Sequence, residues 1–267
     1  MADERTPVVF VHGLWLHSTS WGPWVDLFRQ AGYEPIAPEW PGTPDTVEAA
    51  RANPAAAAGY GITAVADQYA DLIATLPTKP VVVGHSFGGL IAQNLLGRGV
   101  AASGVAIDPA PIKGVLVLPL SSLRVASIAL RNPANYKGTV ALTRDQFRYG
   151  FGNQLSAKES EGLFEMWTIP SPGKSLFEAA TANFVLQSPA GVDTTNATRG
   201  PLLLVAGGKD HTVPEVVVKS THKLYHRSPA VTEFRAFPDR GHSLVIDHGW
   251  REIADYALSW LGSRAPA

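Results

Sequence analysis

The chain has 267 residues, of which 45% are hydrophobic and only 17% are charged. Soluble domains carry about 25% charged residues, so this composition excludes extended disorder and favours a large buried core. The net charge of −1 gives no sign of the strongly basic surface that binds nucleic acids or anionic membranes. We expect one core domain that binds no nucleic acid, and the sequence leaves its oligomeric state open.

Cysteine is absent from the sequence, which excludes a disulfide framework, a cysteine nucleophile and thiolate-based metal centres. Residues 1–7 carry acidic side chains where a signal peptide needs a basic region followed by an apolar run, so we expect a cytoplasmic protein. The most apolar stretch, residues 115–130, contains Pro119 and Arg124 and is shorter than the roughly 20 apolar residues that a bilayer requires. No membrane span is expected.

Short apolar segments recur along the chain, at residues 8–11, 33–37, 81–83, 105–107, 202–206 and 231–237. Several are continuous and β-branched, which is typical of strands buried on both faces of a parallel sheet. Helical patterns lie between many of them, at residues 21–31, 62–75, 89–96, 214–226 and 250–261. This alternation predicts an α/β fold with a mainly parallel sheet and helices on both of its faces.

One long stretch, between Asp108 and Pro201, interrupts the alternation. It is far longer than a single crossover helix requires, and it combines aromatic residues with chain breakers such as residues 170–173. We interpret it as an inserted, largely helical lid. The expected organisation is a core domain built from residues 1–110 and 200–267, with the lid at residues 111–199.

The most specific local pattern is Gly84-His85-Ser86-Phe87-Gly88, between a predicted strand and a predicted helix. In a G-x-S-x-G turn the serine stands on a sharp, strained bend, and the flanking glycines have no Cβ atoms to collide across it. Such a bend lifts the Ser86 hydroxyl clear of the sheet. The following helix directs its N-terminus and the Phe87 amide toward the place where an oxyanion would form.

Two further residues could activate a serine nucleophile. A serine hydroxyl is weak until a base removes its proton, and the base needs a partner that fixes its tautomer. Asp210 follows one predicted strand, and His242 follows the last one. Open α/β sheets place their sites at the carboxyl ends of the strands, so we expect Ser86, His242 and Asp210 to converge as nucleophile, base and acid.

These motifs and their order resemble the α/β-hydrolase superfamily, in particular its lid-bearing esterases and cofactor-free haloperoxidases. The resemblance covers residues 7–109 and 201–261 and does not extend to the lid. It implies the α/β-hydrolase fold and a triad of Ser86, His242 and Asp210. Serine at position 86 departs from haloalkane dehalogenases and epoxide hydrolases, which resemble this chain but have aspartate there, so those reactions are not expected.

The resemblance also implies an oxyanion hole. The segment His12-Gly13-Leu14-Trp15 follows the first predicted strand, where the oxyanion loop of this superfamily lies. The Leu14 amide would then be the second donor beside Phe87.

Other residues have less specific roles. Asp108 follows a further predicted strand and could replace Asp210 as the acid, as in some proteins that this chain resembles; otherwise it is structural or lines the substrate pocket. Trp15, Phe164 and Trp167 are further candidates for lining the pocket, although such aromatic residues also commonly belong to a core.

Five other histidines are expected to have no chemical role. His12 and His85 flank the site and are expected to pack and to hydrogen-bond loops, whereas His211 is expected to point away. His222 and His226 are four residues apart on a predicted helix, but no third ligand is apparent. Since neither a P-loop nor an H-E-x-x-H motif is present, we expect no metal and no cofactor.

Three functions fit these observations. The first is a serine hydrolase that cleaves a carboxylic ester or related acyl compound of small size. The second uses the same triad for carbon-carbon bond hydrolysis, lactone formation, acyl transfer or perhydrolysis, because this fold supports all of these reactions. The third is a binding protein that kept the fold without catalysis, which a missing triad residue would favour; none is missing.

Overall fold

The computed structural model describes residues 5–264, and its centre is a six-stranded parallel sheet with the order β2-β1-β3-β4-β7-β8. Each strand coincides with a predicted segment, and the sheet confirms the predicted α/β fold. The strands are β1 (Pro7–Val11), β2 (Glu34–Ile36), β3 (Val81–His85), β4 (Ser103–Ile107), β7 (Leu202–Gly207) and β8 (Thr232–Phe237). Residues 1–4, on which part of the cytoplasmic expectation rests, lie outside the described residues.

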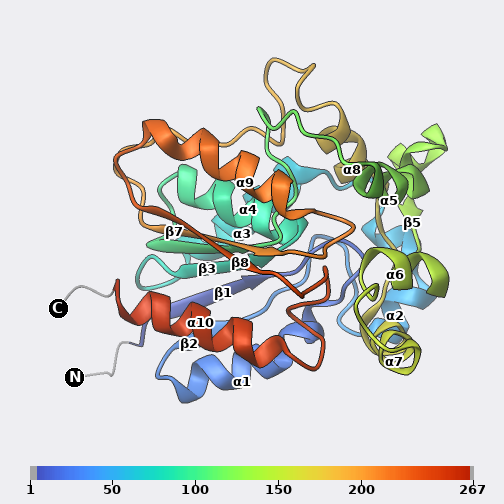
Figure 1. Cartoon of the computed structure of the whole chain (residues 1–267), viewed down its shortest axis with the longest axis horizontal. Helices are drawn as coiled ribbons and strands as arrows, with labels where there is room; N and C mark the ends of the chain where they lie inside the picture. The colour runs from blue at the N-terminus through green and yellow to red at the C-terminus, as the bar shows by residue number, and fades with distance from the viewer. Residues whose placement is uncertain (1–4, 265–267) are drawn as a thin grey trace.

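Helices cover both faces of this sheet (Figure 1). One face carries α3 (Ile62–Ala74), α4 (Phe87–Gly97) and α9 (Glu215–Leu224), and the other carries α1 (Gly22–Gln30) and α10 (Trp250–Gly262). Shorter elements join them: α2 (Val47–Ala52), η1 (Ser18–Trp21), η2 (Pro54–Ala57) and η4 (Tyr225–Arg227). Within residues 5–264, no helix has the length and apolar character needed to cross a bilayer.

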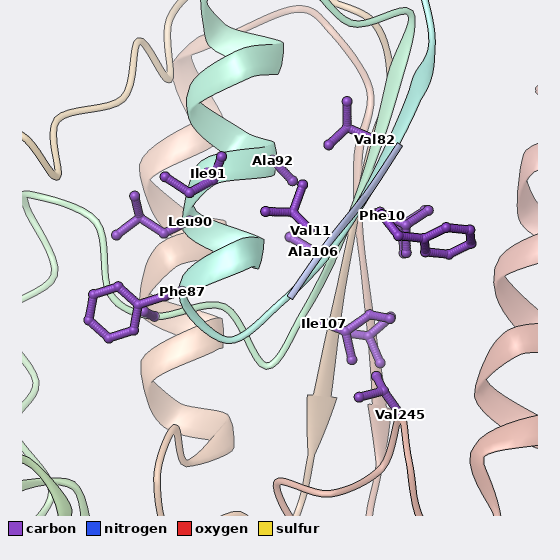
Figure 2. Packing of buried hydrophobic residues seen from close by; sticks show 14 of the residues in the cluster. Phe10, Val11, Val82, Phe87, Leu90, Ile91, Ala92, Ala106, Ile107 and Val245 are labelled. Carbon is purple, nitrogen blue, oxygen red and sulfur yellow. The ribbon is translucent and has the colours of Figure 1, made fainter. Parts of the chain in front are cut away.

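The side chains of β1 alternate between the two faces of the sheet. Phe10 packs against Trp21, Trp24 and Phe28, with ring centroids 5.0, 6.2 and 5.2 Å apart. Val11 points to the opposite face, toward α4 (Figure 2). Because both faces of β1 are buried, its sequence is continuously apolar rather than alternating.

The chain between β4 and β7 forms a separate group of elements at one end of the sheet, beside α2 (Figure 1). We call residues 111–199 the inserted segment. It contains several short helices and one short antiparallel strand pair. Its elements are α5 (Leu120–Leu130), η3 (Pro133–Lys137), β5 (Thr139–Val140), α6 (Arg144–Gly150), α7 (Ala157–Trp167), β6 (Ser171–Pro172) and α8 (Gly173–Ala180).

Arg51 of α2 ties the inserted segment to the rest of the chain. Its guanidinium group donates to the main-chain carbonyls of Phe164, Glu165 and Thr168, over 3.0, 2.9 and 2.8 Å. These carbonyls lie at the end of α7, where a helix runs short of N–H partners for its last carbonyl groups; that of Phe164 also accepts the N–H of Thr168. The positively charged side chain of Arg51 therefore anchors the inserted segment at the end of α7.

Candidate active site

Ser86 stands on the tight turn that joins β3 to α4. Its φ of 56° lies in the left-handed region, which residues with side chains rarely adopt. A Cβ added at Gly84 would collide with the backbone of Gly88, and one added at Gly88 would collide with the main-chain carbonyl of Val11. The two glycines therefore let β1, the turn and α4 approach closely enough to hold Ser86 at the end of the sheet.

Backbone strain is concentrated at this end of the sheet. Among residues 5–264, the non-glycine residues with positive φ are Trp15 (67°), Ser86 (56°) and Asp108 (42°). They follow β1, β3 and β4, which are neighbours in the sheet. Such a conformation costs about 1–3 kcal/mol and persists only where surrounding contacts enforce it. This coincidence points to a functional site at the carboxyl ends of the strands.

His242 connects Ser86 to Asp210. Its Nδ1 donates to Oδ2 of Asp210 over 2.6 Å, and this bond fixes the tautomer in which Nε2 accepts from Oγ of Ser86 at 3.0 Å. Ser86 and Asp210 are each 4% exposed, and His242 is fully buried. Such a chain can move a proton from a hydroxyl to an imidazole while the carboxylate stabilises the imidazolium.

The loop after β7 orients the carboxylate of Asp210. Its Oδ1 accepts the N–H groups of Thr212 and Val213 over 2.6 and 2.9 Å, just before α9 begins. Together with Nδ1 of His242, three N–H donors converge on this one carboxylate. Hydrogen bonds from N–H groups stabilise the ionised form, so Asp210 can carry the negative charge of the site.

Asp108 lies beside this chain without being part of it. Its Oδ1 accepts the N–H of Gly207 at 2.7 Å, whereas its Oδ2 lies 3.9 Å from Nδ1 of His242, beyond hydrogen-bond distance. Burial raises the pKa of Asp108 well above its ordinary value, and the neighbouring Asp210 raises it further. The structure thus brings both candidate acids to His242 and hydrogen-bonds only Asp210 to it.

His85 packs against the ring of His242, with the ring centroids 4.6 Å apart. Its Nε2 donates to the main-chain carbonyl of His242 over 2.9 Å. Burial lowers the pKa of His85 well below its ordinary value, and His242 lowers it further. His85 is therefore a neutral support for the loop that carries His242.

One potential metal-ligand group occurs in the part of the chain that the structure describes: His85, Asp108 and His242, whose ligand atoms lie within 4.8 Å of one another. Both ring nitrogens of His242 already serve Ser86 and Asp210. A metal ion bound there would have to break one of these bonds, so the donor set fits a proton-transfer chain rather than a metal centre.

The loop after β1 lies against Ser86. A Cβ added at Gly13 would come within 2.8 Å of the Cβ of Ser86, so only glycine permits this approach. The next residue, Leu14, is buried, and Trp15 donates its main-chain N–H to Oγ of Ser171 over 2.6 Å. Phe87, on the other side of Ser86, is the first residue of α4, and its side chain points away from the sheet (Figure 2).

The expected pocket residues lie in the inserted segment and the β1 loop. Trp15 is buried, and its indole N–H donates to the carbonyl of Val140 over 3.0 Å. Phe164 and Trp167 on α7 are half-buried. A series of aromatic contacts, two edge-on and one stacked, leads from α7 to His242, with neighbouring ring centroids 4.7–5.7 Å apart: Phe164, Phe147, Phe151 and His242.

Sequence reasoning missed Phe151 and Ser171. Phe151 meets the ring of His242 edge-on, and Ser171 holds the loop after β1. Both lie in the inserted segment, which carries no motif, and Ser171 belongs to a Pro-Ser-Pro-Gly stretch whose only local signal is a chain break. Their contacts join residues far apart in the sequence, for which a single sequence has no signal.

The other histidines make structural contacts. Nδ1 of His12 donates to the carbonyl of Gly13 over 2.9 Å, and its Nε2 accepts the N–H of Trp40 at 3.2 Å. His211 turns away from Asp210, and its Nδ1 donates to the carbonyl of Tyr149 over 3.0 Å. His222 of α9 and His226 of η4 bond to the main-chain carbonyls of Thr232 and Lys223.

The sequence profile of the alpha/beta hydrolase family matches residues 8–256, nearly the whole chain. Together with the parallel sheet and the strained serine turn between β3 and α4, this match shows that the chain belongs to the alpha/beta hydrolase family. Among curated proteins, none matches the chain.

Solved structures of the same fold are numerous and distant in sequence. A monoacylglycerol lipase from Paleococcus ferrophilus is 21% identical over 97% of this chain and 95% of its own, with a TM-score of 0.68. An esterase from Thermogutta terrifontis is 19% identical over 98% and 91%, with a TM-score of 0.65. A protein assigned as a non-heme bromoperoxidase from Mycobacterium tuberculosis H37Rv is 20% identical over 98% and 93%, with a TM-score of 0.72. At these identities the likeness concerns the fold alone.

Proposed function

We propose that the protein is a serine hydrolase that cleaves a small carboxylic ester or related acyl compound through an acyl-enzyme on Ser86. His242 takes the hydroxyl proton as Oγ of Ser86 attacks the carbonyl carbon, and Asp210 stabilises the charged imidazole. The proton then passes to the leaving alcohol. A water molecule, activated by the same imidazole, releases the acid. The observation that carries this proposal is the continuous hydrogen-bonded chain from Asp210 through His242 to Ser86.

The proposed oxyanion hole consists of the main-chain N–H groups of Leu14 and Phe87. As the first residue of α4, Phe87 has no carbonyl partner for its N–H within the helix. The Leu14 N–H makes no hydrogen bond to another of the described residues. Two unpaired donors on either side of Ser86 support acyl chemistry, since losing one such donor typically lowers kcat about 100- to 1,000-fold.

The inserted segment is the proposed lid over the site. Ser86 is only 4% exposed, so a substrate must enter beneath this segment. The aromatic series that ends at His242, with Trp15 nearby, supports a substrate pocket for a compact apolar acyl or alcohol group. That two of the similar structures are an esterase and a lipase supports the ester class. Each proposed step uses only side chains, main-chain amides and water.

The proposal is tested with p-nitrophenyl esters of increasing acyl length, added to the wild-type protein and to Ser86→Ala. We expect turnover by the wild type, fastest with short acyl chains, and none above background for Ser86→Ala. Asp239→Asn, a change on an exposed loop, is the control and should retain the wild-type rate. Cleavage of a vinylogous diketone without any ester turnover would instead assign the triad to carbon-carbon bond hydrolysis.

A further inference from the structure

Asp108 is a buried acidic group for which the proposed reaction gives no role. Its side chain is fully buried, and its Oδ2 meets no hydrogen-bond donor among residues 5–264. Oδ2 of Asp108 and Oδ2 of Asp210 nevertheless lie 3.9 and 2.6 Å from the same ring atom, Nδ1 of His242, so the two carboxyl groups are neighbours. The oxygens of an ionised carboxylate accept hydrogen bonds and cannot donate them. The proximity of Asp108 and Asp210 is therefore favourable only if one of the two groups carries a proton.

The hydrogen-bond partners decide which group is protonated. Two neighbouring carboxylates in a buried site cannot both be ionised, because their like charges repel. Within the described part of the chain, Asp210 accepts three N–H donors, whereas Asp108 accepts only the N–H of Gly207. Since N–H donors stabilise the ionised form, the negative charge belongs on Asp210 and the proton on Asp108.

Among residues 5–264, no lysine or arginine side chain pairs with Asp108 and reverses this assignment. The titratable groups that face Asp108 are Asp210 and the imidazoles of His242 and His85. His242 is neutral before Ser86 is attacked, because its Nε2 must accept the serine proton. His85 is also neutral, since burial lowers its pKa.

We propose that Asp108 is protonated in the resting protein and donates its Oδ2–H to Asp210, which makes Asp108 a positioning residue for the reaction. This inference rests on the proposed function, in which Asp210 must face Nδ1 of His242. The hydrogen bond from Asp108 holds Asp210 in that orientation. It also limits the site to one negative charge, which matches the single positive charge that His242 gains during the reaction.

The first test is Asp108→Asn. The amide has the shape of a protonated carboxyl group, donates to Asp210 through Nδ2, accepts from Gly207 through Oδ1, and has no charge. We expect kcat/KM within about threefold of wild type and an unshifted acid limb of the pH profile. If Asp108 were ionised, the change would remove a negative charge near His242 and move the acid limb to lower pH, which would overturn the proposal.

Asp108→Ala removes the donor and should therefore behave differently. We expect kcat to fall about tenfold or more with little change in KM, because Asp210 loses its orientation while the substrate pocket is unaffected. Asp108→Leu, which fills about the same space without donating a hydrogen bond, should lose as much activity as Asp108→Ala, whereas a purely space-filling role would let leucine restore it. Equal kcat values for the alanine variant and wild type would contradict a positioning role.

The second test measures stability and needs no activity. The unfolded chain releases the Asp108 proton above about pH 4, whereas the folded protein retains it, so this group destabilises the fold increasingly as the pH rises. Urea denaturation between about pH 4 and pH 8 should show Asp108→Asn gaining stability over wild type, by up to about tenfold in the unfolding constant for each pH unit. The control, Asp239→Asn, should show no such gain.

A stability difference that does not change with pH would overturn the protonated state of Asp108. A growing difference in a protein that hydrolyses no ester would instead contradict the proposed function and leave the protonated state supported. The two failures are therefore distinguishable.

Discussion

The main-chain N–H of Trp15 donates a 2.6 Å hydrogen bond to Oγ of Ser171, and both residues are buried. This bond joins the loop after β1, which carries the Leu14 amide, to β6 of the inserted segment. Trp15 accepts a second bond from the same segment, since the N–H of Ile169 donates to its carbonyl over 3.0 Å. The inserted segment therefore sets the conformation of a loop that lies directly beside Ser86.

Ser171→Ala should slow the reaction without weakening substrate binding. The change leaves the Trp15 N–H buried without a partner, at a cost of about 1–3 kcal/mol, so the loop at positive φ relaxes. Because an oxyanion forms only during the reaction, we expect kcat to fall about tenfold or more while KM changes little. Steady-state ester kinetics provide the measurement.

The matched control for Ser171→Ala is Ser175→Ala. Ser175 is buried in the same segment, but its Oγ bonds to the carbonyl of Tyr60 instead of the loop after β1. We expect this variant to retain its kcat. If both alanine variants had the same kcat as wild type, Ser171 would not control the loop.

Asp210→Asn should abolish nearly all activity. The amide has the same shape but can present an N–H to Nδ1 of His242, which disfavours the tautomer whose Nε2 accepts the Ser86 proton. We expect kcat to fall by about four orders of magnitude. The comparison with Asp108→Asn identifies the acid, because a large loss in Asp108→Asn and a small one in Asp210→Asn would exchange their roles.

Gly88→Ala should destabilise the fold as well as the site. The new Cβ would collide with main-chain carbonyls of Val11 and His12, which cannot rotate away as a side chain can. We expect a loss of about 1–3 kcal/mol in the free energy of unfolding, measured by urea denaturation. Gly162→Ala on α7 meets no atom within 4 Å and should gain up to about 1 kcal/mol. Equal stabilities of the two variants would show that the turn is less tightly packed than we describe.

Stability should fall in acid because of His85. Burial and the neighbouring His242 hold the pKa of His85 well below 6.5. In acid, the unfolded chain therefore binds a proton at His85 that the folded protein does not bind. The contribution of His85 to the free energy of unfolding is fully present above about pH 6.5. It is lost as the pH falls, at up to about 1.4 kcal/mol per pH unit. His85→Gln, which keeps a donor for the His242 carbonyl, should show a shallower slope between about pH 7 and pH 5 in urea denaturation. An identical slope would contradict a neutral His85.

The sequence was most informative where local chemistry decides the structure. The four central strands, β1, β3, β4 and β7, are buried on both faces, so their apolar segments were recognisable. The G-x-S-x-G turn predicted the conformation of Ser86 because only glycines fit beside it. The structure brings His242 and Asp210 to Ser86, and their catalytic roles stay predictions.

Contacts between distant segments could not be predicted in this way. Ser171 lies in a stretch whose prolines and glycine indicate only a chain break, and nothing local places it under Trp15. The contact between Asp108 and Asp210 depends on the register of β4 against β7, which determines which side chains meet at the end of the sheet. The sequence patterns also did not predict the short helix α2, because it has too few turns to show a clear apolar face.

The most direct test of the account is reaction with a fluorophosphonate followed by peptide mass spectrometry. This reagent phosphonylates a serine only where a base takes its proton and an oxyanion hole receives the phosphoryl oxygen, with fluoride as the leaving group. We predict a single phosphonyl group on Ser86 in the wild-type protein, much slower labelling in His242→Ala and none in Ser86→Ala. An unlabelled Ser86 in a protein that hydrolyses esters would contradict the account.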